Sequence, residues 1–122
     1  MTRLLFTVHG VVTVAAALVL AITPGAIPGA VGIVLARPAF LLCYLLAAAE
    51  LCIGIVSWGA RNLTDRKALR LVAVSFVVFH GASALFEVWA WTTGVSGRIW
   101  ANVVVRVVAV ALFGYYGIVR RS

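Results

Sequence analysis

The stretch that decides the fold is LRLVAVSFVVFHGASALFEVWAW, residues 69–91, which is almost entirely apolar. At about 1.5 Å of rise per residue, a helix of this length can cross a bilayer with some tilt. Two ionisable side chains, His80 and Glu87, lie seven positions apart, so helical geometry places them on nearly the same face. An ionisable group inside a span is expected to face the bundle interior, a partner or a functional path.

The composition of the whole chain supports a membrane protein. Of its 122 residues, 65% are hydrophobic and only 11% are charged, with a mean hydropathy of +1.17. Soluble domains carry about 25% charged residues, which excludes an ordinary soluble globule. The length allows one domain, residues 1–122, with about four spans. The predicted fold class is therefore all-α: an integral membrane four-helix bundle.

Three further spans are predicted, at 4–22, 39–58 and 99–118. The first could instead be a cleaved signal peptide, but its apolar run is longer than a usual signal core, which favours a retained helix. Residues 23–38 hold all three prolines and are predicted to form an ordered external loop, with room for one short helix. Residues 59–68 form the one strongly polar loop.

The basic residues predict the orientation. With the N-terminus inside the cell, the external connections hold two of them, Arg37 and Arg98, and Arg106 is buried. Cytoplasmic segments carry the excess of Lys and Arg, so both termini and loop 59–68 are predicted to be cytoplasmic, in a multi-pass inner (plasma) membrane protein. These residues also flank the spans and form no face that could read nucleic acid. The seven on the cytoplasmic side are Arg3, Arg61, Arg66, Lys67, Arg70, Arg120 and Arg121.

Depths counted from the span ends predict which polar groups meet. Glu50 and His80 both fall near the midplane, at roughly 16 Å below the external surface. Glu87 and Arg106 both fall in the outer third, and Asn102 lies one helical turn from Arg106. The expected pairs are Glu87 with Arg106 and Glu50 with His80, because an unpaired charge at the bilayer centre costs about 2.5–3.5 kcal/mol.

Two interpretations of this cluster compete. In the structural one, Glu87–Arg106 is an interhelical clamp and a protonated Glu50 is hydrogen-bonded to His80, which fixes the register of the helices. In the functional one, the same groups line a pocket, and Glu50 and His80 form an acid–base couple that isomerises or cyclises a lipophilic substrate. The side chains predicted to bind the polar end of that substrate are Ser83, Glu87, Asn102 and Arg106.

The remaining candidate groups predict packing. Cys43 and Cys52 lie nine positions apart on one helix and point to opposite sides, so they cannot bridge to each other. No Cys/His spacing typical of a metal site occurs, and the sequence leaves the question of a cofactor open. His9 is predicted to be a shallow packed residue, at a depth that is poorly matched with His80 for holding one haem iron.

The layout resembles the DoxX-like group of small four-helix bacterial membrane proteins. The resemblance lies in a first helix ending in "TPGAIPGAVG", a second with "ELCIG", a basic "RNLTDRKALR" loop and a last helix ending in "GYYG". Some members are named after a thiosulfate:quinone oxidoreductase subunit, which implies an association with membrane redox chemistry or a quinone. The Ala, Val and Arg content also fits a GC-rich bacterial source.

The function predicted first is binding of a lipophilic small molecule in the polar interior, with acid–base catalysis on a lipid-like substrate as its extension. The first alternative is an accessory or assembly subunit of a larger membrane redox or transport complex. The second is a proton-coupled small transporter working as a dimer. The expected partners are the lipid bilayer, a lipophilic molecule such as a quinone, and either a second copy of the chain or a larger complex, but no nucleic acid.

Overall fold

The computed structural model describes residues 1–120, which form helices and loops with no strand. Within this range four helical segments are long and apolar enough to cross a membrane. They are α1 (Thr2–Ile22), α3 (Phe40–Ala60, entered through the 3₁₀ turn η1, Arg37–Ala39), α4 (Arg66–Thr92) and α5 (Ile99–Phe113), which continues as a π-helical turn, η2 (Gly114–Val119).

The helix ends follow local chemistry. Asp65 caps α4, since its side chain accepts a hydrogen bond from the backbone N–H of Lys67 at 2.8 Å. Pro24 follows the end of α1, where a proline cannot extend the helix. Gly94 adopts a φ of 115° in the turn between α4 and α5, a conformation that favours glycine.

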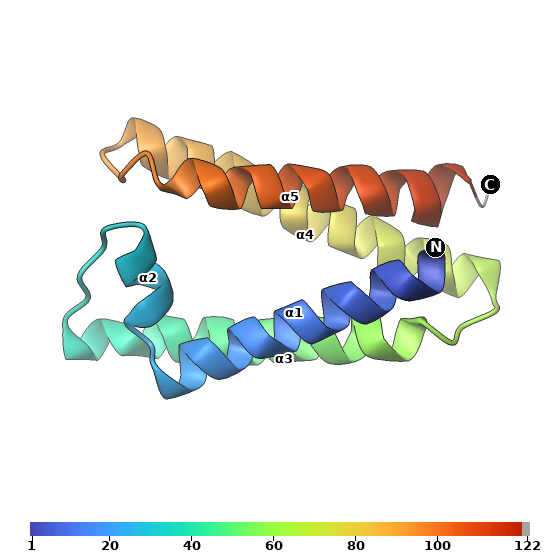
Figure 1. The fold of residues 1–122 in the computed structure, drawn as a ribbon, viewed down its shortest axis with the longest axis horizontal. Helices are drawn as coiled ribbons and strands as arrows, with labels where there is room; N and C mark the ends of the chain where they lie inside the picture. Colours follow the sequence, from blue (N-terminus) through green and yellow to red (C-terminus); the bar gives the residue numbers. More distant parts are fainter. Residues whose placement is uncertain (121–122) are drawn as a thin grey trace.

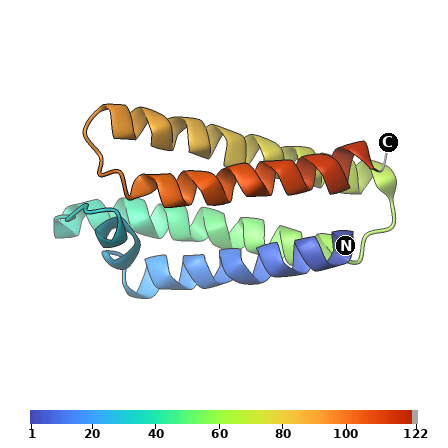
Figure 2. The same ribbon diagram turned by 45° about the horizontal axis from the view of Figure 1, so that its top comes forward.

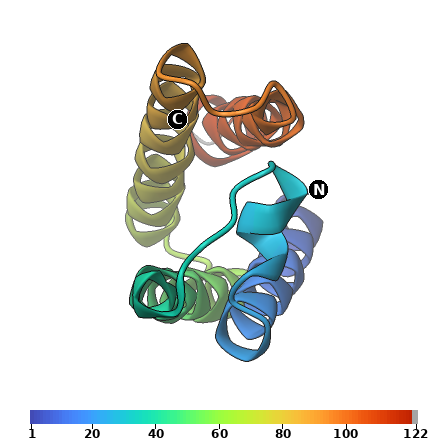
Figure 3. The same cartoon turned by 90° about the vertical axis from the view of Figure 1, so that its left-hand side faces the viewer.

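The four long helices form two antiparallel pairs, α1 with α3 and α4 with α5 (Figure 1). Seen end-on, α3 and α4 lie on one side of the bundle, and α1 and α5 lie on the other side (Figure 3). The short helix α2 (Ala26–Ala30) lies on the α1–α5 side, at the end opposite to Met1. Figure 2 shows that the α4–α5 loop lies at this same end.

Small residues allow close contact within each pair. Gly10 of α1 lies against Gly54 of α3, and a Cβ atom added at Gly54 would be 3.2 Å from the Gly10 carbonyl oxygen. In the other pair, a Cβ atom at Gly117 would collide with the Cβ atom of Ala73 in α4. Such close backbone approach is typical of helices that associate in lipid.

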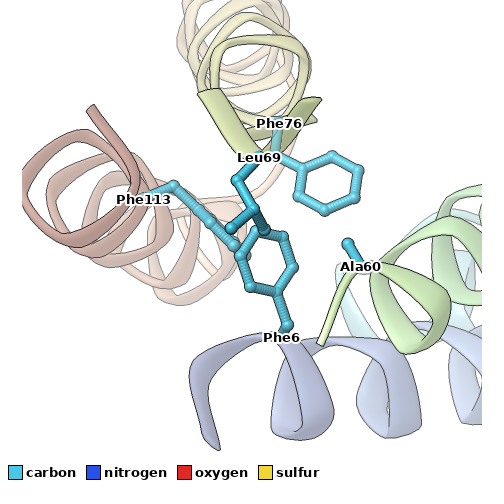
Figure 4. Close-up of a cluster of buried hydrophobic side chains, with 5 residues drawn as sticks. All are labelled: Phe6, Ala60, Leu69, Phe76 and Phe113. Atoms are coloured by element: carbon cyan, nitrogen blue, oxygen red, sulfur yellow. The ribbon is translucent and has the colours of Figure 1, made fainter. Parts of the chain in front are cut away.

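An aromatic cluster joins the two pairs at the end of the bundle that holds the N-terminus and the α3–α4 loop (Figure 4). Phe6 of α1, Phe76 of α4 and Phe113 of α5 pack with ring centroids 5.1–6.1 Å apart. Phe6 and Phe113 are fully buried. Ala60 and Leu69 complete the cluster, so all four long helices contribute to it.

The outer surface is apolar on every long helix. Leu42, Val78, Leu85 and Val105 are each more than 60% exposed, and many other Leu, Ile and Val side chains also face outward. Monomeric soluble proteins rarely leave apolar patches of this extent exposed. This surface is typical of helices that contact lipid.

The four predicted spans coincide with the four long apolar helices, with shifts at their ends. Because Asp65 caps it, α4 starts at Arg66 and not at residue 69, and the polar loop is shorter than 59–68. The loop at 23–38, in which the sequence leaves room for one short helix, contains α2. Arg121, one of the residues used to predict the orientation, lies outside the described range.

Candidate functional site

A chain of hydrogen bonds crosses the bundle and joins all four long helices. His9 of α1 contacts Ser57 of α3 through its Nδ1 atom at 3.0 Å, and its Nε2 atom lies 2.8 Å from Nε2 of His80 in α4. The Nδ1 atom of His80 lies 3.2 Å from Nη1 of Arg106 in α5. At the other end, the Ser57 hydroxyl donates to the carbonyl oxygen of Phe6 at 2.9 Å.

The two ends of this chain fix the direction of every bond in it. A guanidinium can only donate and a carbonyl oxygen can only accept, so Arg106 donates to His80 Nδ1 and Ser57 donates to Phe6. His80 must then donate from Nε2 to Nε2 of His9, and His9 must donate from Nδ1 to Ser57. Each imidazole is therefore neutral and restricted to one tautomer, because a second proton on either ring would place two donors face to face.

Glu87 of α4 holds the other side of Arg106. The Arg106 Nε–H donates to Glu87 Oε1 at 3.3 Å, and the side-chain amide of Asn102 donates to the same oxygen at 2.6 Å. This confirms the predicted Glu87–Arg106 pair. Both side chains are mostly buried, with 16% and 17% exposed, so the opposite charges cancel at the α4–α5 contact.

The predicted Glu50–His80 hydrogen bond is wrong. Both ring nitrogens of His80 are already bonded, one to His9 and one to Arg106. Glu50 of α3 is only 8% exposed and forms no hydrogen bond within residues 1–120. The Glu50 carboxyl group therefore has no protein partner and lies at the wall of a cavity between α1 and α5. The fully buried side-chain atoms without a partner in the described residues are Glu87 Oε2 and Arg61 Nε.

His9 and Ser57 are the residues that sequence reasoning missed at this site. The sequence predicts different depths for His9 and His80, because each depth is counted from the end of its own span. In the structure α1 begins set back from the loop between α3 and α4, and α4 is longer, so the two rings meet (Figure 1). A usable signal was the spacing of Phe6, His9 and Thr13, which places all three near one helical face.

A cavity of about 290 Å³ opens between α1 and α5, directly over the polar groups. Its polar lining consists of Thr13, Glu50, Asn102, Arg106 and the two histidines. Thr13 is 6% exposed and, like Glu50, has no side-chain hydrogen bond in the described part of the chain. The apolar rim is formed by Leu5, Val8, Val12, Ala16, Val105, Val108, Ala109 and Leu112.

The structure thus separates the predicted site residues into two groups. Glu50, His80, Asn102 and Arg106 line one cavity, whereas Glu87 lies behind Arg106 and supports it. Ser83 is half-buried on α4 but neither lines this cavity nor forms a side-chain hydrogen bond within residues 1–120.

The two cysteines differ in exposure. Cys43 is buried and Cys52 is exposed, and both are free. Within residues 1–120 no group of three or more His, Cys, Asp or Glu side chains is placed to hold a metal ion.

The fold and site define a class of protein: an all-α chain with four potential membrane spans, a polar chain of hydrogen bonds, and a cavity containing an unpartnered carboxyl group. Comparisons with protein-family models, curated proteins and solved structures find no match. Function is therefore inferred from the residues of the cavity.

Proposed function

We propose that this chain is a multi-pass inner-membrane protein that binds a lipophilic small molecule in the cavity between α1 and α5. Four apolar helices and an apolar outer surface support insertion in a bilayer. The excess of basic residues beside Met1, in the α3–α4 loop and after α5 supports cytoplasmic termini.

The observation that carries the proposal is Glu50. Most buried side-chain polar atoms in proteins have a hydrogen-bond partner, and an exception calls for an explanation. Glu50 is 8% exposed and has no hydrogen bond through either oxygen within residues 1–120, and it lies at the cavity wall. Glu87, the other acid of the cluster, is paired with Arg106 and Asn102 through Oε1, and its unpartnered Oε2 is buried away from the cavity. A bound molecule with a polar group would supply the partner that the protein does not.

The cavity is accessible from the side of the bundle, where lipid would lie. On its rim, Val8 and Val12 of α1 are 52% and 60% exposed, and Val105 and Val108 of α5 are 63% and 51% exposed. A molecule dissolved in the bilayer could enter between these side chains without crossing water. This geometry favours an apolar ligand with one polar end.

Catalysis is an extension of this proposal and would centre on Glu50. Its carboxyl group faces the cavity and could exchange a proton with a substrate. His80 is a poorer candidate than the sequence predicted, since it would first have to release His9 or Arg106. The resemblance to the DoxX-like group stays a prediction, and a quinone is one lipophilic molecule that it suggests.

An accessory subunit of a larger membrane complex is the second candidate. The self-contained Glu87–Arg106 pair favours it, because a structural clamp needs no ligand. A proton-coupled transporter has no comparable support, since α1 contains no carboxylate.

The proposal is tested by native mass spectrometry of protein extracted in mild detergent. Wild-type protein is expected to retain a small molecule that Val105→Trp loses, because residue 105 lines the cavity. Val104→Trp is the matched control, because its neighbour Val104 is 58% exposed and does not line this cavity. Equal retention by both variants would place the molecule elsewhere, and a partner chain without any small molecule would favour the accessory subunit.

A further inference from the structure

We propose that the ligand is a lipophilic amine whose protonated nitrogen pairs with Glu50 and whose apolar tail extends into a second cavity beneath α2. This inference rests on the proposed function and names the ligand class of the same site. Three observations support it: the charges around the first cavity, the position of the second cavity, and Arg98, which lines the second cavity.

The charges of the polar cluster cancel except at Glu50. Arg106 is paired with Glu87, and the hydrogen-bond chain keeps His9 and His80 neutral. An ionised Glu50 therefore leaves the cavity with one unbalanced negative charge. An ammonium group would balance it, whereas a carboxylate or phosphate group would be repelled by it.

The hydrogen-bonding groups of the cavity agree with this assignment. The ring N–H groups of His9 and His80 and the bonded amide N–H of Asn102 are already donated to protein acceptors. The Glu50 oxygens are acceptors without a protein donor within residues 1–120 and lie at the cavity wall. Glu87 Oε2 also has no donor, but Glu87 does not line the cavity. Arg106 has further N–H groups, but Glu87 already balances its charge. A ligand that donates hydrogen bonds fits Glu50 best.

The second cavity, of about 520 Å³, continues from the first. Asn102 and Val105 of α5 line both. On α3, Cys43 lines the second cavity seven residues before Glu50, which is two helical turns or about 10 Å away on the same face. Its other lining is almost wholly apolar and includes Leu20, Ile27, Val31 and Leu46. An apolar chain extending from Glu50 would therefore run along α3 towards α2, which lies beside the start of α3 (Figure 1).

Charge also sets the direction in which such a ligand lies. Arg98, at the start of α5, lines the second cavity. An ammonium group would be repelled there and attracted at Glu50, so the charged end lies at Glu50 and the tail beneath α2. The apolar walls of the second cavity favour binding of the tail, because its apolar surface is buried there.

The head group is tested by calorimetric titration of the protein in lipid nanodiscs with decylamine, decanol and decanoate. Decylamine is expected to bind at least tenfold more tightly than decanol, and decanoate more weakly than both. Glu50→Gln should reduce decylamine binding to the level of decanol and leave decanol unchanged. Equal binding of amine and alcohol by the wild type would overturn the amine while leaving the proposed function intact; binding of none of the three would overturn both.

The tail is tested with Leu46→Trp, which fills the second cavity. This variant should weaken decylamine binding at least tenfold and leave butylamine binding unchanged, because the shorter amine does not extend past Glu50. The control is Leu45→Trp, since Leu45 is 60% exposed and lines neither cavity. If Leu46→Trp and Leu45→Trp bind decylamine equally well, the tail does not lie beneath α2.

Discussion

His80 received different partners from those predicted because a buried polar group bonds according to donors and acceptors, and depth along a helix is only one condition. Its two nitrogens need one donor and one acceptor, which Arg106 and His9 supply. The Glu87–Arg106 pair was easier to predict, since opposite charges at equal depth on adjacent antiparallel helices have few other partners. Glu50 was identified from sequence as buried and inward-facing, but its lack of a partner could only come from the structure.

The hydrogen-bond chain predicts a specific tautomer for each histidine. His9 should carry its proton on Nδ1 and His80 on Nε2, because Arg106 and the Phe6 carbonyl fix the direction. Solid-state NMR of ¹⁵N-labelled imidazoles in bilayers distinguishes these forms at neutral pH. Two rings in the same tautomer, or one charged ring, would show that the chain does not run in this direction.

Removal of Arg106 should destabilise the bundle strongly. Arg106→Ala leaves Glu87 without its cation and His80 without a donor, and breaking a buried pair costs about 3–5 kcal/mol. The double change with Glu87→Ala should recover part of this loss. The measurement is unfolding in mixed micelles, with Arg98→Ala as an exposed control expected to change stability by less than about 0.5 kcal/mol. Strictly additive effects at residues 87 and 106 would contradict the pairing.

At the scale of the helices, hydrophobic length predicted each element, and local capping set the ends. The run at 69–91 indicated a span, but Asp65 extended the helix to Arg66. What sequence could not provide was the relative displacement of α1 and α4, because that depends on packing of the phenylalanine cluster and on close contact between helices. This displacement brings His9 level with His80.

Close packing of α1 against α3 predicts different effects of alanine at two glycines of one helix. At Gly54 an added Cβ atom would lie 2.6 Å from Val14 Cγ2 and 3.1 Å from the Val14 backbone nitrogen. Gly54→Ala should therefore lower the unfolding free energy by about 1–3 kcal/mol. Gly59→Ala meets no atom within 4 Å and should be neutral or slightly stabilising. Equal effects in thermal unfolding would contradict the close contact.

At the scale of the molecule, sequence predicted the number of spans, and the structure adds that they form two pairs with a lateral cavity between α1 and α5. Periodicity cannot reveal that cavity, because it exists only where two helices distant in sequence are held apart. The short helix α2 lines the second cavity, which shares Asn102 and Val105 with the first, so the proline-rich loop helps to form the proposed site.

For the whole molecule, the distribution of basic residues predicts that both termini are cytoplasmic. In a background without Cys43 and Cys52, Val34→Cys should react with an impermeant maleimide on intact cells, since Val34 is 97% exposed in the loop predicted to be external. Asn62→Cys, in the α3–α4 loop, should react only after permeabilisation. The opposite pattern would reverse the orientation.

The central claim is that Glu50 binds a ligand and does not hold the fold together. The most direct test measures both properties of Glu50→Gln: its thermal unfolding in detergent and the small molecule that it retains in native mass spectrometry. Because Glu50 has no protein partner within residues 1–120, the account predicts unchanged or higher stability together with loss of the retained molecule. A large loss of stability, with the same molecule still bound, would contradict it and make Glu50 a structural residue.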